Sequence, residues 1–353
     1  MTLLPLIGHQ SLRERLSEQL SRGALPASLL FQGPPGVGKQ RLALWLAQRL
    51  LCSGTAPPCG ECQHCRYVLQ GAHPDLQWFF PLPRIKASTD IALEDVRNEY
   101  AEAIKERVAA HGLYPRADGS QGIFVYVTRA LVQEAVRSAA MAKHKVIIVG
   151  DAERMVPQIG NPEAANAFLK LLEEPPANTT IILTTSEPGA LLPTIRSRVV
   201  SVRVAPLSDT DVRAFLAQPP AADAAGKGAV DDLVRAANGA PGSLIGGADR
   251  GAAVDRARKL LDAAGGGRDR VLRAAFVQGS SKARGAFSDV LDALTVLLHD
   301  RAREALSAGD GDRAAASVKA VRIVEDAKRS AEGNVNPQLV TAHLLRELDE
   351  AGV

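Results

Sequence analysis

Short apolar runs alternate with amphipathic, helix-like stretches from residue 10 to about residue 204. Ser28 to Gln32 and Lys145 to Val149 are strand-length runs of mostly apolar side chains, and such runs are typical of strands buried inside a parallel sheet. The same patterns predict further strands at 75–80, 180–183 and 199–204, and helices at 10–22, 40–51 and 163–174. Because strands that alternate with helices form sheets covered on both faces, we predict an α/β fold with a doubly wound parallel sheet.

The strand pattern ends at Pro206, and the remainder of the chain has a helical pattern. We expect three parts in order: an α/β domain at 1–206, a small helical lid at 207–248 and an all-helical domain at 249–353. Glycine-rich stretches at 264–267 and 308–311 should divide the last domain into separate helices.

Two segments depart from these regular patterns. Residues 83–121 are polar and irregular, with one helical stretch near 91–110, and we expect them to form an insertion on the surface. Residues 217–229 combine alanine, proline and glycine, so we expect a flexible loop there.

Composition and charge exclude few classes of function. The formal net charge of +3 is too small to predict DNA binding from bulk charge. The sequence has no apolar run of membrane-spanning length, and Met1 to Gly8 lacks the basic leader of a signal peptide. We therefore expect a cytoplasmic protein.

A glycine-rich turn follows the first predicted strand and fits the phosphate-loop pattern G-x-x-x-x-G-K. Its residues are Gly33, Pro34, Pro35, Gly36, Val37, Gly38 and Lys39. Glycines let backbone N–H groups turn toward a phosphate, and the start of the next helix adds positive potential. The next position normally carries a serine or threonine whose hydroxyl binds Mg²⁺, but here it is Gln40. The motif predicts ATP or ADP binding, with doubtful placement of Mg²⁺.

The acidic motif that usually completes such a site is also incomplete. In one register, Gly150 replaces the metal-binding aspartate and Asp151 replaces the glutamate that activates water. In the other, Asp151 is the metal-binding residue and Ala152 replaces the glutamate. Either way one carboxylate is missing, and we interpret Glu153 as a solvated acid at a helix start.

All four cysteines lie close together, as Cys52, Cys59, Cys62 and Cys65. Four thiolates are the usual ligand set of structural Zn²⁺, and the two C-x-x-C steps share Cys62. We predict a zinc knuckle at 52–65 that holds a loop together. His64 is a possible substitute ligand, but we interpret it as a bystander.

Three further motifs carry a resemblance to a known family. The run Ala165 to Pro176 (ANAFLKLLEEPP) closely resembles a helix of bacterial DNA polymerase III clamp-loader subunits, which are AAA+ proteins, and Thr194 to Val199 (TIRSRV) resembles their arginine motif. A zinc knuckle between the first helix and the second strand is also a hallmark of that family. Asn334 to Leu339 (NVNPQL) looks like the end of its helical collar domain.

Within this family, the chain resembles the delta-prime branch rather than the gamma/tau ATPase motor. The changes at Gln40 and in the acidic motif favour this, as does Ser243, which stands where a motor carries the arginine called sensor 2. Thr185 resembles the polar residue called sensor 1, with Thr184 as the runner-up.

The resemblance implies a non-motor, ATPase-defective subunit of a five-subunit ring that loads the sliding clamp onto primed DNA. Its partners would be gamma/tau, delta, the clamp and the DNA, and 249–353 would be the collar that assembles the ring. Arg198 would be an arginine finger that acts on ATP bound by the neighbouring gamma/tau subunit, whereas Arg196 has a structural role or lies near DNA. A gamma/tau-type motor and a general AAA+ adaptor without a role in replication are the alternatives.

Overall fold

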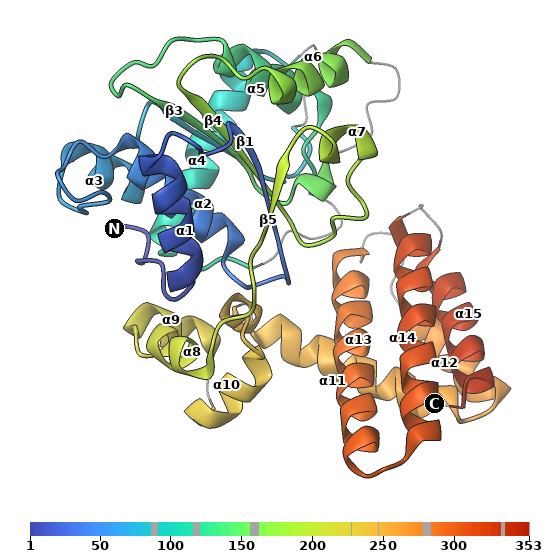
Figure 1. Cartoon of the computed structure of the whole chain (residues 1–353). Helices are drawn as coiled ribbons and strands as arrows, with labels where there is room; N and C mark the ends of the chain where they lie inside the picture. Colours follow the sequence, from blue (N-terminus) through green and yellow to red (C-terminus); the bar gives the residue numbers. More distant parts are fainter. Residues whose placement is uncertain are drawn as a thin grey trace. The chain divides into compact units, whose positions relative to one another are not determined.

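The computed structural model describes residues 1–85, 91–115, 121–155, 162–226, 228–245, 247–277, 284–332 and 336–352. They fall into two compact units, one within 1–245 and the other within 247–352 (Figure 1). No helix in the described part of the chain is both long and apolar enough to cross a membrane.

The first unit is built on a parallel sheet whose strand order is β2-β3-β4-β1-β5. The strands are β1 Ser28–Gln32, β2 Leu76–Phe79, β3 Lys145–Val149, β4 Thr179–Thr185 and β5 Val200–Arg203. β3 and β4 are buried along their whole length, as expected for central strands covered on both faces. The parallel α/β sheet predicted from the sequence is therefore confirmed.

The helices of the sheet region cover both faces of the sheet (Figure 1). They are α1 Gln10–Ser21, α2 Lys39–Leu51, α3 Gln63–Leu69, α4 Leu93–Ala109, α5 Val125–Ala135, the short turn η1 Ala152–Arg154, α6 Pro162–Glu173 and α7 Pro193–Arg196. Leu42 and Leu46 are fully buried on the inner face of α2. This helix starts at the carboxyl edge of the sheet because Lys39 closely follows the end of β1. In register, Gln32 of β1 lies beside Thr185 of β4, so the turns that follow these strands meet at one edge.

Within the expected surface insertion at 83–121, α4 is mostly exposed but packs one face against the sheet core. α4 buries Val96, Tyr100 and Val108 in the same core as the sheet. The Tyr100 hydroxyl also donates to the carbonyl of Phe80 at 2.6 Å. These apolar side chains recur at helical spacing, a signal that the polar residues between them obscured. Positions 86–90 and 116–120 lie outside the described residues.

Four short helical elements follow β5 within the same unit: α8 Asp209–Leu216, α9 Pro219–Ala225, α10 Val230–Ala237 and η2 Pro241–Leu244. They share a small core that includes Val212, Leu216 and Val234. The prediction of a flexible loop at 217–229 is wrong for Pro219–Ala225, which form α9. Proline is well tolerated in the first turn of a helix and alanine is the best helix former, so this composition suits a short helix.

The second unit is all helical, with α11 Gly247–Ala264, α12 Arg268–Val277, α13 Arg284–Ser307, α14 Gly311–Glu332 and α15 Pro337–Glu350. The expected glycine-rich breaks separate α11 from α12 and α13 from α14. Leu291, Leu294 and Leu298 of α13 are fully buried in the core of this bundle. Several large apolar side chains stay exposed on α12 and α15: Leu272, Phe276, Val277 and Leu339.

Candidate functional site

The phosphate loop joins β1 to α2, and two of its glycines, Gly33 and Gly36, have no room for a side chain. A Cβ on Gly33 would lie 2.2 Å from the carbonyl oxygen of Val204, and one on Gly36 would lie 2.5 Å from the backbone nitrogen of Ser243. Gly36 and Gly38 also have positive φ angles of 80° and 95°, which glycine adopts without strain. The loop is therefore packed between β5 on one side and η2 on the other.

Lys39 begins α2 and is held inside the loop. Its side chain is 6% exposed, and its Nζ donates to the carbonyls of Gly33 at 2.9 Å and Pro34 at 2.8 Å and to the Ser186 hydroxyl at 2.9 Å. The ammonium thus lies where the motif predicts it, at the carboxyl edge of the sheet.

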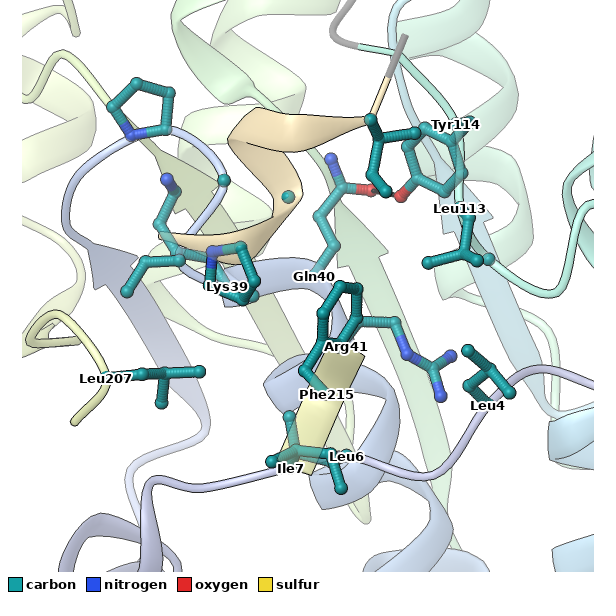
Figure 2. A pocket seen from close by; sticks show the side chains of 18 of the residues that line it. Leu4, Leu6, Ile7, Lys39, Gln40, Arg41, Leu113, Tyr114, Leu207 and Phe215 are labelled. Atoms are coloured by element: carbon teal, nitrogen blue, oxygen red, sulfur yellow. Dashed lines mark hydrogen bonds between the residues drawn. The ribbon is translucent and has the colours of Figure 1, made fainter. Parts of the chain in front are cut away.

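Gln40 lies at the centre of a hydrogen-bond network. Figure 2 shows its amide beside the Tyr114 hydroxyl. Its Nε2 donates to Oδ2 of Asp151 at 3.1 Å. Its Oε1 accepts from three groups: Trp78 Nε1 at 3.1 Å, the Tyr114 hydroxyl at 3.2 Å and Arg107 Nη1 at 3.3 Å. A carbonyl oxygen has two lone pairs, so this oxygen is saturated by protein donors.

Gly150 follows β3 and lies directly against Gln40. A Cβ built on Gly150 would meet Cδ, Oε1 and Nε2 of Gln40 at 2.5–2.6 Å. Of the two registers left open by the sequence, this contact favours the one in which Gly150 stands at the metal-binding position. Ala152 is instead buried in η1.

The interpretation of Glu153 as a solvated acid is wrong. Its Oε1 accepts from the backbone nitrogen of Ser186 at 3.0 Å, and its Oε2 is shielded from solvent. Burial raises the pKa of this carboxyl group, and the neighbouring Asp151 raises it further. Glu153 and Lys39 therefore both contact Ser186, which the sequence analysis did not single out.

Arg107 and Tyr114 are the other site residues that sequence reasoning missed. The Arg107 guanidinium lies over the rings of Phe80 and Tyr114, 3.2 and 3.8 Å from their centroids. Burial lowers the pKa of Arg107, but an arginine stays charged at neutral pH. A single arginine in a mostly polar helix, or a single tyrosine after it, gives no local signal of such a position.

Thr185 and Thr184 end β4 and are fully buried. The Thr185 hydroxyl accepts from the backbone nitrogen of Glu187 at 3.0 Å, and the Thr184 hydroxyl accepts from that of Asp151 at 3.0 Å. Both side chains shape the turns around the site.

A cavity of about 180 Å³ opens beside the loop (Figure 2). Its apolar wall includes Leu4, Ile7, Leu113 and Phe215. Arg41 also lines it, and its Nη1 is shielded from solvent without a hydrogen-bond acceptor among the described residues. Burial lowers the pKa of Arg41 to about 10. The pocket combines an apolar half with a strongly cationic half, which suits an anion that carries a flat apolar group.

The four cysteines converge as the sequence predicts. Their Sγ atoms all lie within 4.8 Å of one another. The Cys52–Cys59, Cys52–Cys62 and Cys59–Cys65 sulfur pairs are 3.5, 3.8 and 3.9 Å apart. A tetrahedral zinc with Zn–S bonds of about 2.3 Å places its sulfurs about 3.8 Å apart, so the cluster fits this ion.

Backbone amides complete the cysteine cluster. The N–H groups of Gly54 and Cys59 donate to Cys52 Sγ at 3.3 and 3.4 Å, and that of Cys65 donates to Cys62 Sγ at 3.4 Å. Such donors stabilise thiolates, the form that binds zinc. His64 instead contacts His73 through ring nitrogens 2.8 Å apart, in agreement with its predicted bystander role.

Arg198 lies just after α7 and contacts its own chain. Its Nη2 lies 3.2 Å from Oε1 of Glu173, and its Nη1 donates to the carbonyl of Thr194 at 2.9 Å. The Arg198 side chain is 27% exposed, so this ion pair lies at the surface of the first unit.

Residues 8–208, more than half of the chain, match the family model described as DNA polymerase III, delta subunit. The chain belongs to this family.

Curated relatives agree with that assignment. The DNA polymerase III subunit delta' of Pseudomonas aeruginosa is 34% identical over 173 residues, which are 48% of this chain and 40% of the relative. Subunit delta' of Escherichia coli is 31% identical over 187 residues, 52% of this chain and 44% of the relative. Subunit gamma/tau of Mycobacterium tuberculosis is 31% identical over 215 residues, 60% of this chain and 30% of the relative. The chain thus matches less than half of the length of each relative.

Proposed function

We propose that this chain is a delta-prime-type, non-motor subunit of a DNA polymerase III clamp loader, which helps to place the sliding clamp on primed DNA. Family membership and the delta' relatives support this role. The observation that carries the non-motor part is the Gln40–Gly150 contact, because the amide fills the space between the two positions that bind Mg²⁺ in active phosphate-loop ATPases.

Phosphoryl transfer needs a metal ion that neutralises charge on the phosphates and a group that orients the attacking water. Because the usual metal ligands are replaced here, the site lacks the means to hold that metal ion. We expect the isolated chain to hydrolyse ATP very slowly or not at all, as measured by phosphate release. Lys39→Ala should change the ATPase rate of the assembled complex little. Robust turnover that Lys39→Ala abolishes would support the motor alternative.

Arg198 is the proposed arginine finger. A guanidinium is planar, permanently charged and able to make paired hydrogen bonds to phosphate oxygens. The ion pair with Glu173 would hold this side chain in the free subunit, and because both groups are partly exposed, the pair is weak enough to be exchanged for a phosphate.

The test of the finger is Arg198→Ala in a loader reconstituted with gamma/tau and delta subunits. We expect normal assembly with reduced DNA-dependent ATPase and reduced clamp loading, and Arg198→Lys should rescue poorly. Fingers in other nucleotide hydrolases contribute about 10³–10⁵ in rate, and the loss here should be smaller because one of several sites is affected. Wild-type ATPase and loading rates in the Arg198→Ala loader would contradict the proposal.

A gamma/tau-type motor is the second candidate. The gamma/tau relative matches 60% of this chain, a larger share than either delta' relative. The ATPase measurement on the isolated chain separates the two candidates. Failure to bind gamma/tau and delta would instead favour the general AAA+ adaptor.

A further inference from the structure

Among the described residues, the Gln40 network leaves no complete set of oxygen ligands for a divalent cation beside the phosphate loop. Mg²⁺ requires near-octahedral oxygen ligands at about 2.0–2.1 Å. The Gln40 oxygen already accepts three hydrogen bonds, from Trp78, Tyr114 and Arg107. Gly150 offers no carboxylate, and a side chain at that position would collide with the amide.

A fixed positive charge lies beside Gln40, next to the pocket lining rather than within it. The Arg107 guanidinium donates to Gln40 and is held among the rings of Trp78, Phe80 and Tyr114. A buried guanidinium repels a second cation and attracts an anion, and the low polarity of its surroundings strengthens both effects.

Anion-binding groups are nevertheless retained around the loop. Lys39 is buried at the loop, and Arg41 presents a shielded Nη1 that has no acceptor among the described residues. Asp151, the nearest carboxylate of the pocket, is engaged by Gln40 Nε2. The pocket thus keeps its means of binding a phosphate and has lost its means of binding the metal that normally accompanies one.

We propose that this pocket binds a nucleoside diphosphate or triphosphate without a divalent cation, with the Arg107 guanidinium supplying the positive charge that Mg²⁺ supplies elsewhere. The inference rests on the nucleotide-binding part of the proposed function and not on assembly with partner subunits. A chain that assembles with gamma/tau but binds no nucleotide would overturn this inference alone.

The test is calorimetric titration of the full chain with ADP, once in EDTA and once in magnesium chloride. We expect equal or tighter binding in EDTA, because magnesium competes with the protein for the phosphates. An affinity gain of about tenfold or more with magnesium would overturn the proposal, as would no binding at about millimolar ADP in either buffer.

Two sets of variants sharpen the test. Arg107→Gln should weaken ADP binding by about tenfold or more, whereas Lys105→Gln, the same charge change on the exposed face of α4, should leave it unchanged.

The double variant Gln40→Thr with Gly150→Asp restores a hydroxyl and a carboxylate, and should make ADP binding tighter with magnesium than in EDTA. Equal ADP affinity in Arg107→Gln and wild type would contradict the role of this guanidinium. If either variant fails to fold, the wild-type titration still decides.

Discussion

At the scale of single residues, Gln40 connects the phosphate loop to two elements far away in the sequence. Its oxygen accepts from β2 through Trp78 and from the region of α4 through Arg107 and Tyr114. A buried donor that loses its acceptor costs about 1–3 kcal/mol. The amide therefore stabilises the first unit as well as occupying the proposed metal position.

We predict that Gln40→Ala lowers the free energy of unfolding of the first unit by about 2–4 kcal/mol, since several buried donors lose their acceptor. Urea unfolding followed by tryptophan fluorescence measures this, because Trp45 and Trp78 are the two tryptophans of the chain and both lie in the first unit. Gln10→Ala, at the exposed start of α1, is the control and should change stability by less than about 0.5 kcal/mol. Equal effects of the two substitutions would show that the network adds nothing to stability.

Glu153 makes the stability of the first unit depend on pH. Its folded-state pKa is raised above the ordinary value of 4.5, first by burial and then by Asp151. Between the unfolded and folded pKa values the native state binds more protons, so stability falls as the pH rises through this window. Above the folded pKa, the ionised carboxylate lowers the free energy of unfolding by an amount that no longer changes with pH.

We therefore expect Glu153→Gln to stabilise the first unit at neutral pH, because the amide oxygen can still accept from Ser186 without carrying a charge. The gain should shrink as the pH falls through the folded pKa toward 4.5, and it should be absent below that value. Urea unfolding of both chains across this pH range provides the measurement. A stabilisation that grows as the pH falls would contradict the assigned direction of the shift.

At the scale of elements, the cysteine cluster links the end of α2 to the start of α3. Cys52 follows the last residue of α2, and Cys62 is the residue that caps α3. A structural zinc contributes directly to the folding of the segment that it binds. The loop between these helices should thus depend on the metal, whereas the phosphate loop lies at the opposite end of α2.

We predict about one zinc per chain by metal analysis of protein kept reduced and free of chelators. Cys62→Ser should lower the zinc content and increase proteolysis within 52–65, with a smaller effect on ADP binding. Glu61→Ala, an exposed neighbour, should retain the metal. A zinc content near zero in wild-type protein would rule out the site.

Most of the elements could be predicted because their signals are local. The apolar runs of β1 and β3 and the double proline after α6 mark these elements within about a residue of their observed bounds. α4 was predicted as a helix, but its burial was not, because that depends on a partner surface elsewhere in the chain. The network around Gln40 joins residues up to 111 positions apart, so no pattern along the sequence predicts it.

At the scale of the whole molecule, the two units have separate hydrophobic cores. The sheet core and the small core of α8 to α10 lie within 1–245, and the bundle core lies within 247–352. A compact unit with its own core is expected to fold without the other.

We predict that residues 1–245 fold alone, with the tryptophan emission and urea midpoint of the full chain, but do not co-purify with gamma/tau and delta subunits. The exposed apolar side chains of α12 and α15 are the proposed contacts that this truncation removes. Normal assembly by the truncated chain would contradict the collar assignment of 249–353.

The mutual fit of Gln40 and Gly150 also bears on the mutational history that is open to such a chain. A carboxylate introduced at position 150 alone would collide with the Gln40 amide. A hydroxyl introduced at position 40 alone would leave the buried donors of Trp78 and Tyr114 without their acceptor, and the carboxylate would still be missing. Each single step lowers stability and neither restores a complete pair of metal ligands, so natural selection has no gain to act on at the first step. A return to the ordinary pair of metal ligands therefore requires changes at both positions together.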